Sequence, residues 1–550
     1  MCTATGGLGA RGRLTKVTDP SGSTSWAYDL AGRVISKAQT VGAGAGARTF
    51  TVGYGYTAGL LASITYPSGR VVTLGHDPQG QATSLAVDGG ALLSGGVYFP
   101  FGGVRQWTWA NGQVYQRLFD ADGRVSGVTL GPSTHTWADL NQAFGYDVLD
   151  RLTSAGIAAG QALGFSYDAN GNRTGTTLNG GATTTYTYAG SSHRLSSLSG
   201  ATSRSFTYDA AGNLTASAGV TYTYDGRGRM KQAGSATYLV NGLGQRVRKT
   251  AGAQTHFAYD EAGRLLGEYD STGAAIQEYV WLGDLPVAVV RPASPGGFTA
   301  YYVWADHLGT PRVVSDAANV VRWEWANANP FGAHAPDDNP SGAGAFAFNL
   351  RFPGQYYDAE TGTTYNYWRQ YDASLGRYLQ SDPIGLSGGL NTFAYVGGRP
   401  LTAFDDFGLQ ACTNLTCIPG LTNRRLISAT RGNPSPWALE NIHIEPVDTP
   451  PIPPTRVGGL VPLDINMGNE HGTCFFARYR DINEVWGIYR QFACLQICTA
   501  DCGQPYSRWN IQEQLEDTEQ RQRRDREQFV KSFSAPIVAL KCRQFLDGLR

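Results

Sequence analysis

The stretch FSYDANGNRTGTTLNGGATTTYTYAGSSHRLSSLSGATSRSFTYDAAGNLTASAGVTYTYDGRGRMKQ, residues 165–232, decides the fold because one short unit recurs in it. The unit is an aromatic residue, Asp, two variable residues, Gly, then Arg or Asn, and an apolar residue. Asp and Gly at these places favour a tight turn, since Asp bonds to the backbone ahead of it and Gly accepts a positive φ. The flanking residues alternate between polar and apolar, which is the period of a half-buried strand. The unit therefore predicts a β-hairpin.

The unit recurs along much of the chain. Good copies begin at Tyr28, Phe119, Tyr167, Tyr208, Tyr224 and Tyr259, and looser copies begin at His76, Tyr146, Tyr188 and Val240. The spacings from Tyr146 to Tyr167, Tyr188 and Tyr208 are 21, 21 and 20 residues, which fits one hairpin per repeat. A single hairpin is marginally stable, so the units must stack into one long sheet, and a long sheet twists and coils around an interior. We expect residues 10–409 to be almost entirely antiparallel β-structure, with the Asp-Gly turns on one edge.

The composition agrees with such an array and excludes other classes. Gly is 71 of 550 residues and charged residues are only 16%, which suits short strands and tight turns. The formal net charge is zero, so nucleic acid is not indicated as a partner. No apolar run is long enough to predict a membrane span. The first residues lack the apolar core of a signal peptide and resemble the middle of an array, which suggests a truncated or late-starting chain.

The repeats resemble the YD repeats of bacterial Rhs proteins, insecticidal toxin-complex C proteins and teneurins, over roughly residues 10–409. This resemblance implies a spiral of hairpins that forms a cage-like shell. The segments 301–332, 350–386 and 388–409 are similar to the RHS-associated core that closes such arrays. We therefore expect a repeat shell over 1–300, a core that acts as plug and autoprotease over 301–409, and a variable C-terminal cargo, which in this family is often a toxin, over 410–550.

In that family the core is an aspartate-dependent autoprotease that cuts after a closing Asp-x-x-Gly-Leu. Here the motif runs from Asp405 to Gly408 and Leu409, so the resemblance places the cut between Leu409 and Gln410. The residue after Asp405 differs from the family's motif, in which Pro is usual, because this chain has Asp406 there. Without Pro the backbone φ is no longer fixed, and a third carboxylate adds repulsion.

Two carboxylates in one confined site can share the work of cutting a peptide bond, since like charges held close together do not both ionise easily. Asp382, in the sequence SDPIGL, is the first candidate, and Asp405 is the second. Arg377 could hold one carboxylate or stabilise charge on the attacked carbonyl. The alternative is that Asp382 and Asp405 only cap turns. The two would share macroscopic pKa values, so neither is assigned as acid or base here.

Three other features of the core favour structural roles. His307 lies beside a turn and is expected to be structural rather than a general base. Trp304, Trp323 and Trp325 are expected to pack in the plug rather than bind sugar. The acidic stretch 334–339 lacks the Gly and the distal Glu of a calcium loop, so a solvated loop is expected. No metal and no cofactor are predicted.

The tail after Leu409 leaves the repeat pattern. It holds seven of the eight cysteines, namely Cys412, Cys417, Cys474, Cys494, Cys498, Cys502 and Cys542. Disulfides are favoured over a metal site, because a turn at Gly503 interrupts the helical spacing of the cysteines. A proline-rich connector precedes residues that have helical periodicity from about 483, so a small mixed or mainly helical segment is predicted. His443, Glu470 and His471 are weak candidates for a nuclease or another hydrolase.

These observations favour a delivery scaffold that encloses its own C-terminal segment as cargo and releases it by self-cleavage. The setting would be competition between bacteria or toxin delivery. A secretion-apparatus component and a cognate immunity protein are possible partners, and an exported or extracellular location is expected. Two alternatives remain open. One is a structural or adhesive surface protein with an uncleaved tail, and the other is a tail that is itself a hydrolase or nuclease.

Overall fold

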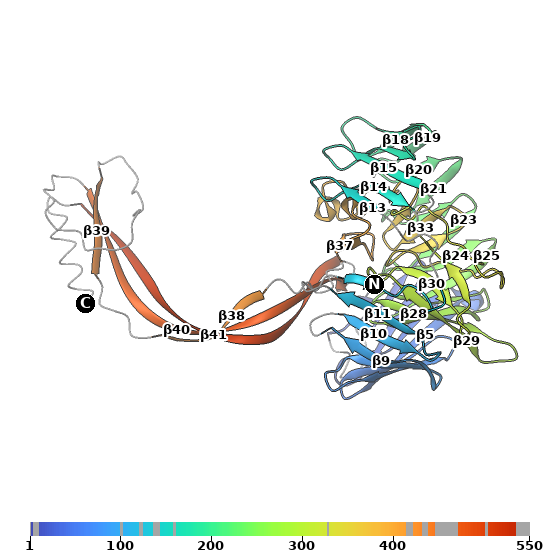
Figure 1. The fold of residues 1–550 in the computed structure, drawn as a ribbon, viewed down its shortest axis with the longest axis horizontal. Helices are drawn as coiled ribbons and strands as arrows, with labels where there is room; N and C mark the ends of the chain where they lie inside the picture. The colour runs from blue at the N-terminus through green and yellow to red at the C-terminus, as the bar shows by residue number, and fades with distance from the viewer. Residues whose placement is uncertain are drawn as a thin grey trace. The chain divides into compact units, whose positions relative to one another are not determined.

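The computed structural model describes residues 2–3, 10, 12–99, 103–119, 125–135, 143–157, 161–326, 329–413, 422–431, 438–445, 471–500 and 504–534. The chain divides into two compact units. The first consists of residues 1–418 with 493–510, and the second consists of 419–492 with 511–550. The first unit contains all of the repeats, and Figure 1 shows it as a succession of hairpins.

Two large sheets make up most of the first unit. In each of them every strand pairs with the strand that follows it in the sequence, and the pairs are antiparallel. The twelve-stranded sheet contains β1 (Cys2–Thr3), β2 (Lys16–Asp19), β3 (Gly22–Tyr28), β4 (Val34–Val41), β5 (Arg48–Thr57), β6 (Leu60–Thr65), β7 (Val71–His76), β8 (Ala82–Val87), β9 (Gly90–Tyr98), β10 (Val104–Trp109), β11 (Val114–Phe119) and β12 (Val125–Val128).

The nineteen-stranded sheet contains β13 (Ala143–Tyr146), β14 (Leu152–Ile157), β15 (Gln161–Tyr167), β16 (Arg173–Leu178), β17 (Thr184–Tyr188), β18 (Leu195–Gly200), β19 (Arg204–Tyr208), β20 (Leu214–Ser217), β21 (Val220–Tyr224), β22 (Met230–Ala233), β23 (Ala236–Val240), β24 (Arg246–Ala251), β25 (Ala253–Tyr259), β26 (Leu265–Tyr269), β27 (Ala275–Leu282), β28 (Leu285–Pro292), β29 (Phe298–Ala305), β30 (Pro311–Ser315) and β31 (Val321–Glu324). Strands β29–β31, which the sequence assigns to the core domain, thus continue the repeat sheet.

The repeat unit forms the expected turn. After Tyr208, the backbone N of Asn213 donates to Asp209 Oδ1 at 2.8 Å, and Gly212 has a φ of 89°. The strand register slips by one residue at Tyr208, which makes a β-bulge. The same Asp-to-backbone bond recurs at Asp29, Asp147, Asp168, Asp225 and Asp260. These turns all join an odd-numbered strand to the next even-numbered one, so within each sheet they lie on one edge, as predicted.

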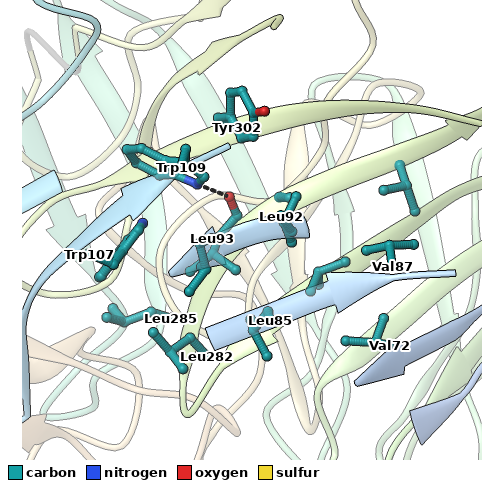
Figure 2. Packing of buried hydrophobic residues seen from close by; sticks show 14 of the residues in the cluster. Val72, Leu85, Val87, Leu92, Leu93, Trp107, Trp109, Leu282, Leu285 and Tyr302 are labelled. Carbon is teal, nitrogen blue, oxygen red and sulfur yellow. Dashed lines mark hydrogen bonds between the residues drawn. The ribbon is translucent and has the colours of Figure 1, made fainter. Parts of the chain in front are cut away.

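The first sheet packs face to face against the later strands of the second. Leu85, Trp107 and Trp109 of the first sheet share a buried cluster with Leu282 and Tyr302, as Figure 2 shows. Trp109 also donates its indole N–H to the carbonyl oxygen of Val287, at 3.3 Å. This cluster covers one face of β26–β30.

The opposite face of the same strands is covered by residues 329–411, here called the plug. Neighbouring residues on a strand point to opposite faces. Tyr302 therefore packs against the first sheet, while Val303 joins a second cluster with Phe348 and Tyr371 of the plug. All five residues of β26 are buried for this reason. Strands β26–β30 are the middle layer of three.

The plug has little regular structure. A four-stranded sheet contains β32 (Tyr356–Asp358), β33 (Thr363–Asn366), β34 (Arg369–Asp372) and β35 (Arg377–Tyr378). Two short 3-10 helices follow, η3 (Gly385–Gly388) and η4 (Val396–Gly398), and another, η2 (Gly44–Gly46), lies between β4 and β5 of the first sheet. A buried ion pair fastens the plug to the repeats, since both guanidinium nitrogens Nη1 and Nη2 of Arg246 in β24 bond to Asp358 at 2.6 and 2.7 Å.

The tail is described as strands. β36 (Ala403–Phe404) pairs with β37 (Cys412–Thr413), and the second unit holds β38 (Thr422–Arg431) and β39 (Ala438–Glu445). β40 (His471–Ala500) and β41 (Gln504–Ser534) belong partly to each unit, because residues 493–510 are assigned to the first. Strands β38, β39 and β41 all pair with β40. The mixed or mainly helical character that the sequence predicts for the tail stays a prediction.

Candidate functional site

The closing motif forms the tip of a hairpin. Strands β36 and β37 pair on either side of it, with Phe404 opposite Cys412. Gly408 has a φ of 66°, in the left-handed region that glycine adopts without strain. The backbone N of Leu409 donates to Asp405 Oδ1 at 2.9 Å, and the backbone N of Gln410 donates to the same oxygen at 3.3 Å. The Asp405 carboxylate therefore lies against the nitrogen of the predicted scissile bond.

Asp382 lies on the other side of the same bond. Its turn is fixed by the backbone N of Ile384, which donates to Asp382 Oδ1 at 3.0 Å. A Cβ on Gly388 would come within 2.3 Å of Asp382 Oδ2 and 2.6 Å of the carbonyl oxygen of Leu409. The second carboxylate oxygen and the predicted scissile carbonyl thus face the same small space, which stays open because residue 388 is glycine. Burial raises the pKa of Asp382 to about 6, and the Asp405 charge adds to this while Arg369 opposes it.

Arg369, the first residue of β34, joins the two carboxylates. Its Nη2 lies 2.9 Å from Asp382 Oδ2 and 3.2 Å from Asp405 Oδ2. Its Nε donates to the carbonyl oxygen of Gly408, and its Nη1 donates to that of Thr392 at 3.1 Å. The side chain is 3% exposed. One buried guanidinium therefore holds both acids and the backbone next to the predicted cut.

Tyr378 completes the surroundings of Asp405. Its hydroxyl donates to Asp405 Oδ2 at 2.7 Å, and its ring lies 3.7 Å below the guanidinium carbon of Arg369. Burial, followed by the Asp405 charge, raises the pKa of Tyr378 well above its ordinary value, so the hydroxyl stays a donor. Asn366 Nδ2 donates to the Tyr378 hydroxyl and to the Asp405 carbonyl oxygen, both at 2.8 Å.

The structure brings together four of the predicted site features, namely Asp382, Asp405, Gly408 with Leu409, and Gln410. It places Arg377 elsewhere. The guanidinium of Arg377 donates to the carbonyl oxygen of His193 and lies near the rings of Tyr188 and Phe393. The cause is strand alternation: Tyr378 points to Asp405, so its neighbour Arg377 points to the opposite side of β35. Arg369 takes the place that the sequence suggested for Arg377.

Sequence reasoning missed Arg369, Tyr378 and Gly388. The plug segment offered several arginines beside aromatic residues, and spacing alone does not select one of them. The register of β34 against β35, in which Tyr371 pairs with Tyr378, puts Arg369 on the side of the carboxylates. Gly388 could be found only from its close approach to Asp382.

Asp406, which replaces the family's usual Pro, is a third carboxyl group at the site. Burial raises its pKa well above the ordinary value, and the charges of Asp284 and Asp405 add to the shift. The backbone of Asp406 packs tightly on Gly354, where an added Cβ would overlap the carbonyl oxygen of Asp406.

The remaining residues singled out from the core have structural surroundings. His307 Nε2 lies 2.9 Å from the carbonyl oxygen of Leu401. Trp304 is buried against the first sheet, and Trp323 and Trp325 are buried against the plug, which agrees with the packing role. Most of the stretch 334–339 is exposed.

The tail candidates are only partly described. His443 lies in β39 opposite Thr473, and His471 lies opposite Glu445 in the same strand pair. Glu470, Cys417, Cys502 and Cys542 lie outside the described residues. Among the residues that the structure does describe, no group of His, Cys, Asp and Glu could hold a metal ion. In the same residues no helix is long and apolar enough to cross a membrane.

Comparison with known proteins identifies the family. A family model of the teneurin YD-shell matches residues 133–279 and 283–388, and a model of the RHS repeat matches residues 10–45. Together these matches cover just over half of the chain. The chain is an RHS/YD-repeat protein.

Toxins are among the relatives of this RHS/YD-repeat protein. Toxin protein Tse5 of Pseudomonas aeruginosa is 42% identical over 104 residues, which is 19% of this chain and 7% of the relative. Double-stranded DNA deaminase toxin A of Burkholderia cenocepacia is 28% identical over 307 residues, which is 53% of this chain and 18% of the relative. The chain thus spans less than a fifth of the length of either protein.

Solved structures share the fold of the repeats. The crystal structure of TcdB2-TccC3 matches 72% of this chain and 25% of that one, with a TM-score of 0.55 and 18% identity. A structure of the Photorhabdus luminescens Tc holotoxin pore matches 73% of this chain and 24% of that one, with a TM-score of 0.54 and 18% identity. These matches show that the mainly β fold of the repeats occurs in solved structures.

Proposed function

We propose that this RHS/YD-repeat protein is a toxin-delivery scaffold that cuts itself once, between Leu409 and Gln410. The repeats are the delivery shell, and residues 410–550 are the cargo. The plug is the autoprotease. The observation that carries the proposal is the position of the two carboxyl groups, with Asp405 against the Gln410 nitrogen and Asp382 beside the Leu409 carbonyl.

The arrangement supports hydrolysis by a divided pair of acids. A pKa of about 6 leaves part of the Asp382 population protonated near neutral pH, and in that form Asp382 donates a hydrogen bond to the Leu409 carbonyl oxygen. Water adds to the polarised carbonyl carbon, and Asp405 accepts the proton that the water loses. Asp405 then gives that proton to the Gln410 nitrogen, which it already contacts. The C–N bond breaks, and the second proton of the water passes to the new amine, so Leu409 ends in a carboxylate and Gln410 begins with an ammonium group.

Arg369 and Tyr378 position the reacting groups in this mechanism. The bonds from Arg369 to both acids and to the Gly408 carbonyl hold the two carboxyl groups in fixed positions relative to the scissile segment. Such pre-alignment is worth several powers of ten in rate. After the cut, the backbone pairing of β36 with β37 would still hold the new end of the cargo.

Export through a specialised secretion route, with an immunity protein that protects the producing cell, belongs to the same proposal. It is supported by the toxins among the relatives. The activity of residues 410–550 is not part of it.

Intact mass spectrometry of the purified chain tests the cut. The expected result is two fragments in place of the 59.0 kDa chain, the smaller one beginning Gln-Ala-Cys-Thr. Asp382→Asn and Asp405→Asn should each leave the chain whole. Asp29→Asn, which changes a turn aspartate of the same kind in the first sheet, should still be cut. A wild-type chain that stays whole would favour the adhesive surface protein, and unchanged cutting in both site variants would refute the mechanism.

A further inference from the structure

Arginines of the repeat unit usually pair with the aspartate of their own turn. Arg33 Nε donates to Asp29 Oδ2 at 2.7 Å, Arg151 Nε to Asp147 Oδ2 at 2.6 Å, and Arg264 Nε to Asp260 Oδ2 at 2.7 Å. The charge of each arginine is thereby balanced within the turn.

Arg229 occupies the same place in its repeat but does not form this pair. Its backbone N still donates to Asp225 Oδ1 at 2.9 Å, so the turn itself is intact. The guanidinium instead lies 3.3 Å above the ring of Trp368 in the plug. The residue is only 3% exposed, and Nε, Nη1 and Nη2 all lack a hydrogen-bond partner among the described residues. Asp225 acts on it only as a more distant charge.

The guanidinium lines a pocket between the repeats and the plug. Two further arginines line the pocket, but their charges are already balanced: Arg246 pairs with Asp358 at 2.6 Å, and Arg369 pairs with Asp382 at 2.9 Å. The other lining residues that the structure describes are uncharged: Met230, Val240, Tyr365, Tyr367, Trp368, Gln370 and Gln380. The uncompensated charge in the pocket is therefore that of Arg229.

Burial of an unpaired cation is unfavourable. The stacking on Trp368 offsets part of this cost, and burial still lowers the pKa of Arg229 to about 10. An anion in the pocket would supply both the missing charge and acceptors for the free N–H groups. The free volume is about 10 Å³, roughly the space that one water-sized particle needs. Phosphate, sulfate and carboxylate ligands are larger than that.

We infer that this pocket binds a single halide ion, held by the guanidinium of Arg229 between the repeat turn and the plug. Chloride is the ion of suitable size and charge in ordinary salt. The site would link the repeats to the closing segment, because the backbone N of the stacked Trp368 donates to the carbonyl oxygen of Phe407 at 3.1 Å. The inference does not depend on self-cleavage.

Bromide identifies the ion directly. Crystals of the purified full-length protein grown in sodium bromide should show an anomalous bromine peak in contact with the Arg229 guanidinium. A feature at this place without anomalous signal would be water, and it would overturn the inference.

Thermal unfolding tests the same site in solution. At constant sodium concentration, replacing gluconate by chloride should raise the melting temperature of the wild type along a saturable curve. Arg151→Met, which removes an arginine from the same place in another repeat, should keep this response, and Arg229→Met should lose it. Equal responses in the two variants would refute the site. If Arg229→Met fails to fold, the bromide peak in the wild type decides.

Discussion

Replacing Arg369 by Met should destabilise the plug by an amount that depends on pH. The substitution keeps the length of the side chain but removes the cation between Asp382 and Asp405, whose side chains are each 2% exposed. Removing one partner of a buried ion pair costs about 3–5 kcal/mol, because the other charge is left buried and unpaired. We expect a loss of that size at pH 8, where Asp382 is ionised.

The sign of the pH dependence follows from Asp382. Its pKa is about 6 even with Arg369 present, and the attraction of Arg369 lowers it. Removing the arginine therefore raises the pKa further. A carboxyl group with a raised pKa in the folded state destabilises the fold above its unfolded pKa, and this penalty disappears as the pH falls and the group takes up a proton. The loss of unfolding free energy in Arg369→Met should thus be smaller at pH 5 than at pH 8. The difference is about 2 kcal/mol if the pKa of Asp382 rises by about 1–2.

The assay is urea unfolding at pH 8 and pH 5, with hydrogen exchange of residues 363–372 to localise the effect. Arg351→Met is the matched control, since Arg351 is also buried in the plug but donates to the carbonyl oxygens of Phe348 and Leu350 rather than to an acid. It should destabilise to the same extent at both pH values. An equal loss at both pH values in Arg369→Met would show that Arg369 does not balance these carboxylates.

Four further outcomes are expected. Gly388→Ala would place a methyl group 2.3 Å from Asp382 Oδ2, so mass spectrometry should show self-cleavage slowed by about 10²-fold. In the control Gly226→Ala the added methyl group meets nothing within 4 Å, so this variant should be cut at the normal rate. Leu409→Asn should stop the cut, because the new amide would donate to Asp405 Oδ2, as Asn213 Nδ2 donates to Asp209 Oδ2 at 2.9 Å. The control Leu409→Met adds no donor and should be cut. Asp406→Pro fixes φ and restores the family motif, so a time course on gels should show faster cutting, and a slower one would contradict this. Alkylation of the native, non-reduced protein should label one or a few thiols, and labelling of all seven tail cysteines would reject the disulfides.

The fold of the repeats could be predicted because the unit specifies its own turn. Asp209 and Gly212 determine the hairpin from within a few residues, and the period then repeats it along the sheet. The layering could not be predicted in this way. Tyr302 and Val303 are both buried because the first sheet and the plug cover opposite faces of β29, and these partners are distant in sequence. The tail has no repeated unit, so its sequence offers no comparable signal for its fold.

The candidate site was predictable to the extent that its acids lie in recognisable turns. Asp382 and Asp405 each precede a glycine by three residues, and the family resemblance marked both of them. The choice of Arg369 over Arg377 depended on which face of a short strand turns inward. That choice is made by the register of β34 against β35 and leaves no trace in the spacing of charged residues.

The turn geometry also explains why Asp405, among many turn aspartates, is available for chemistry. In an ordinary repeat the aspartate Oδ1 accepts the backbone N–H four residues ahead, and Oδ2 accepts the side chain of that same residue, as with Asp260 and Arg264. Asp405 keeps the first bond, to the backbone N of Leu409. Leucine has no side-chain donor, so Oδ2 remains open to Arg369 and Tyr378. Capping a turn and serving a reaction are therefore compatible roles for Asp405, because the repeat unit provides the turn and one apolar residue in place of Arg or Asn frees the second oxygen.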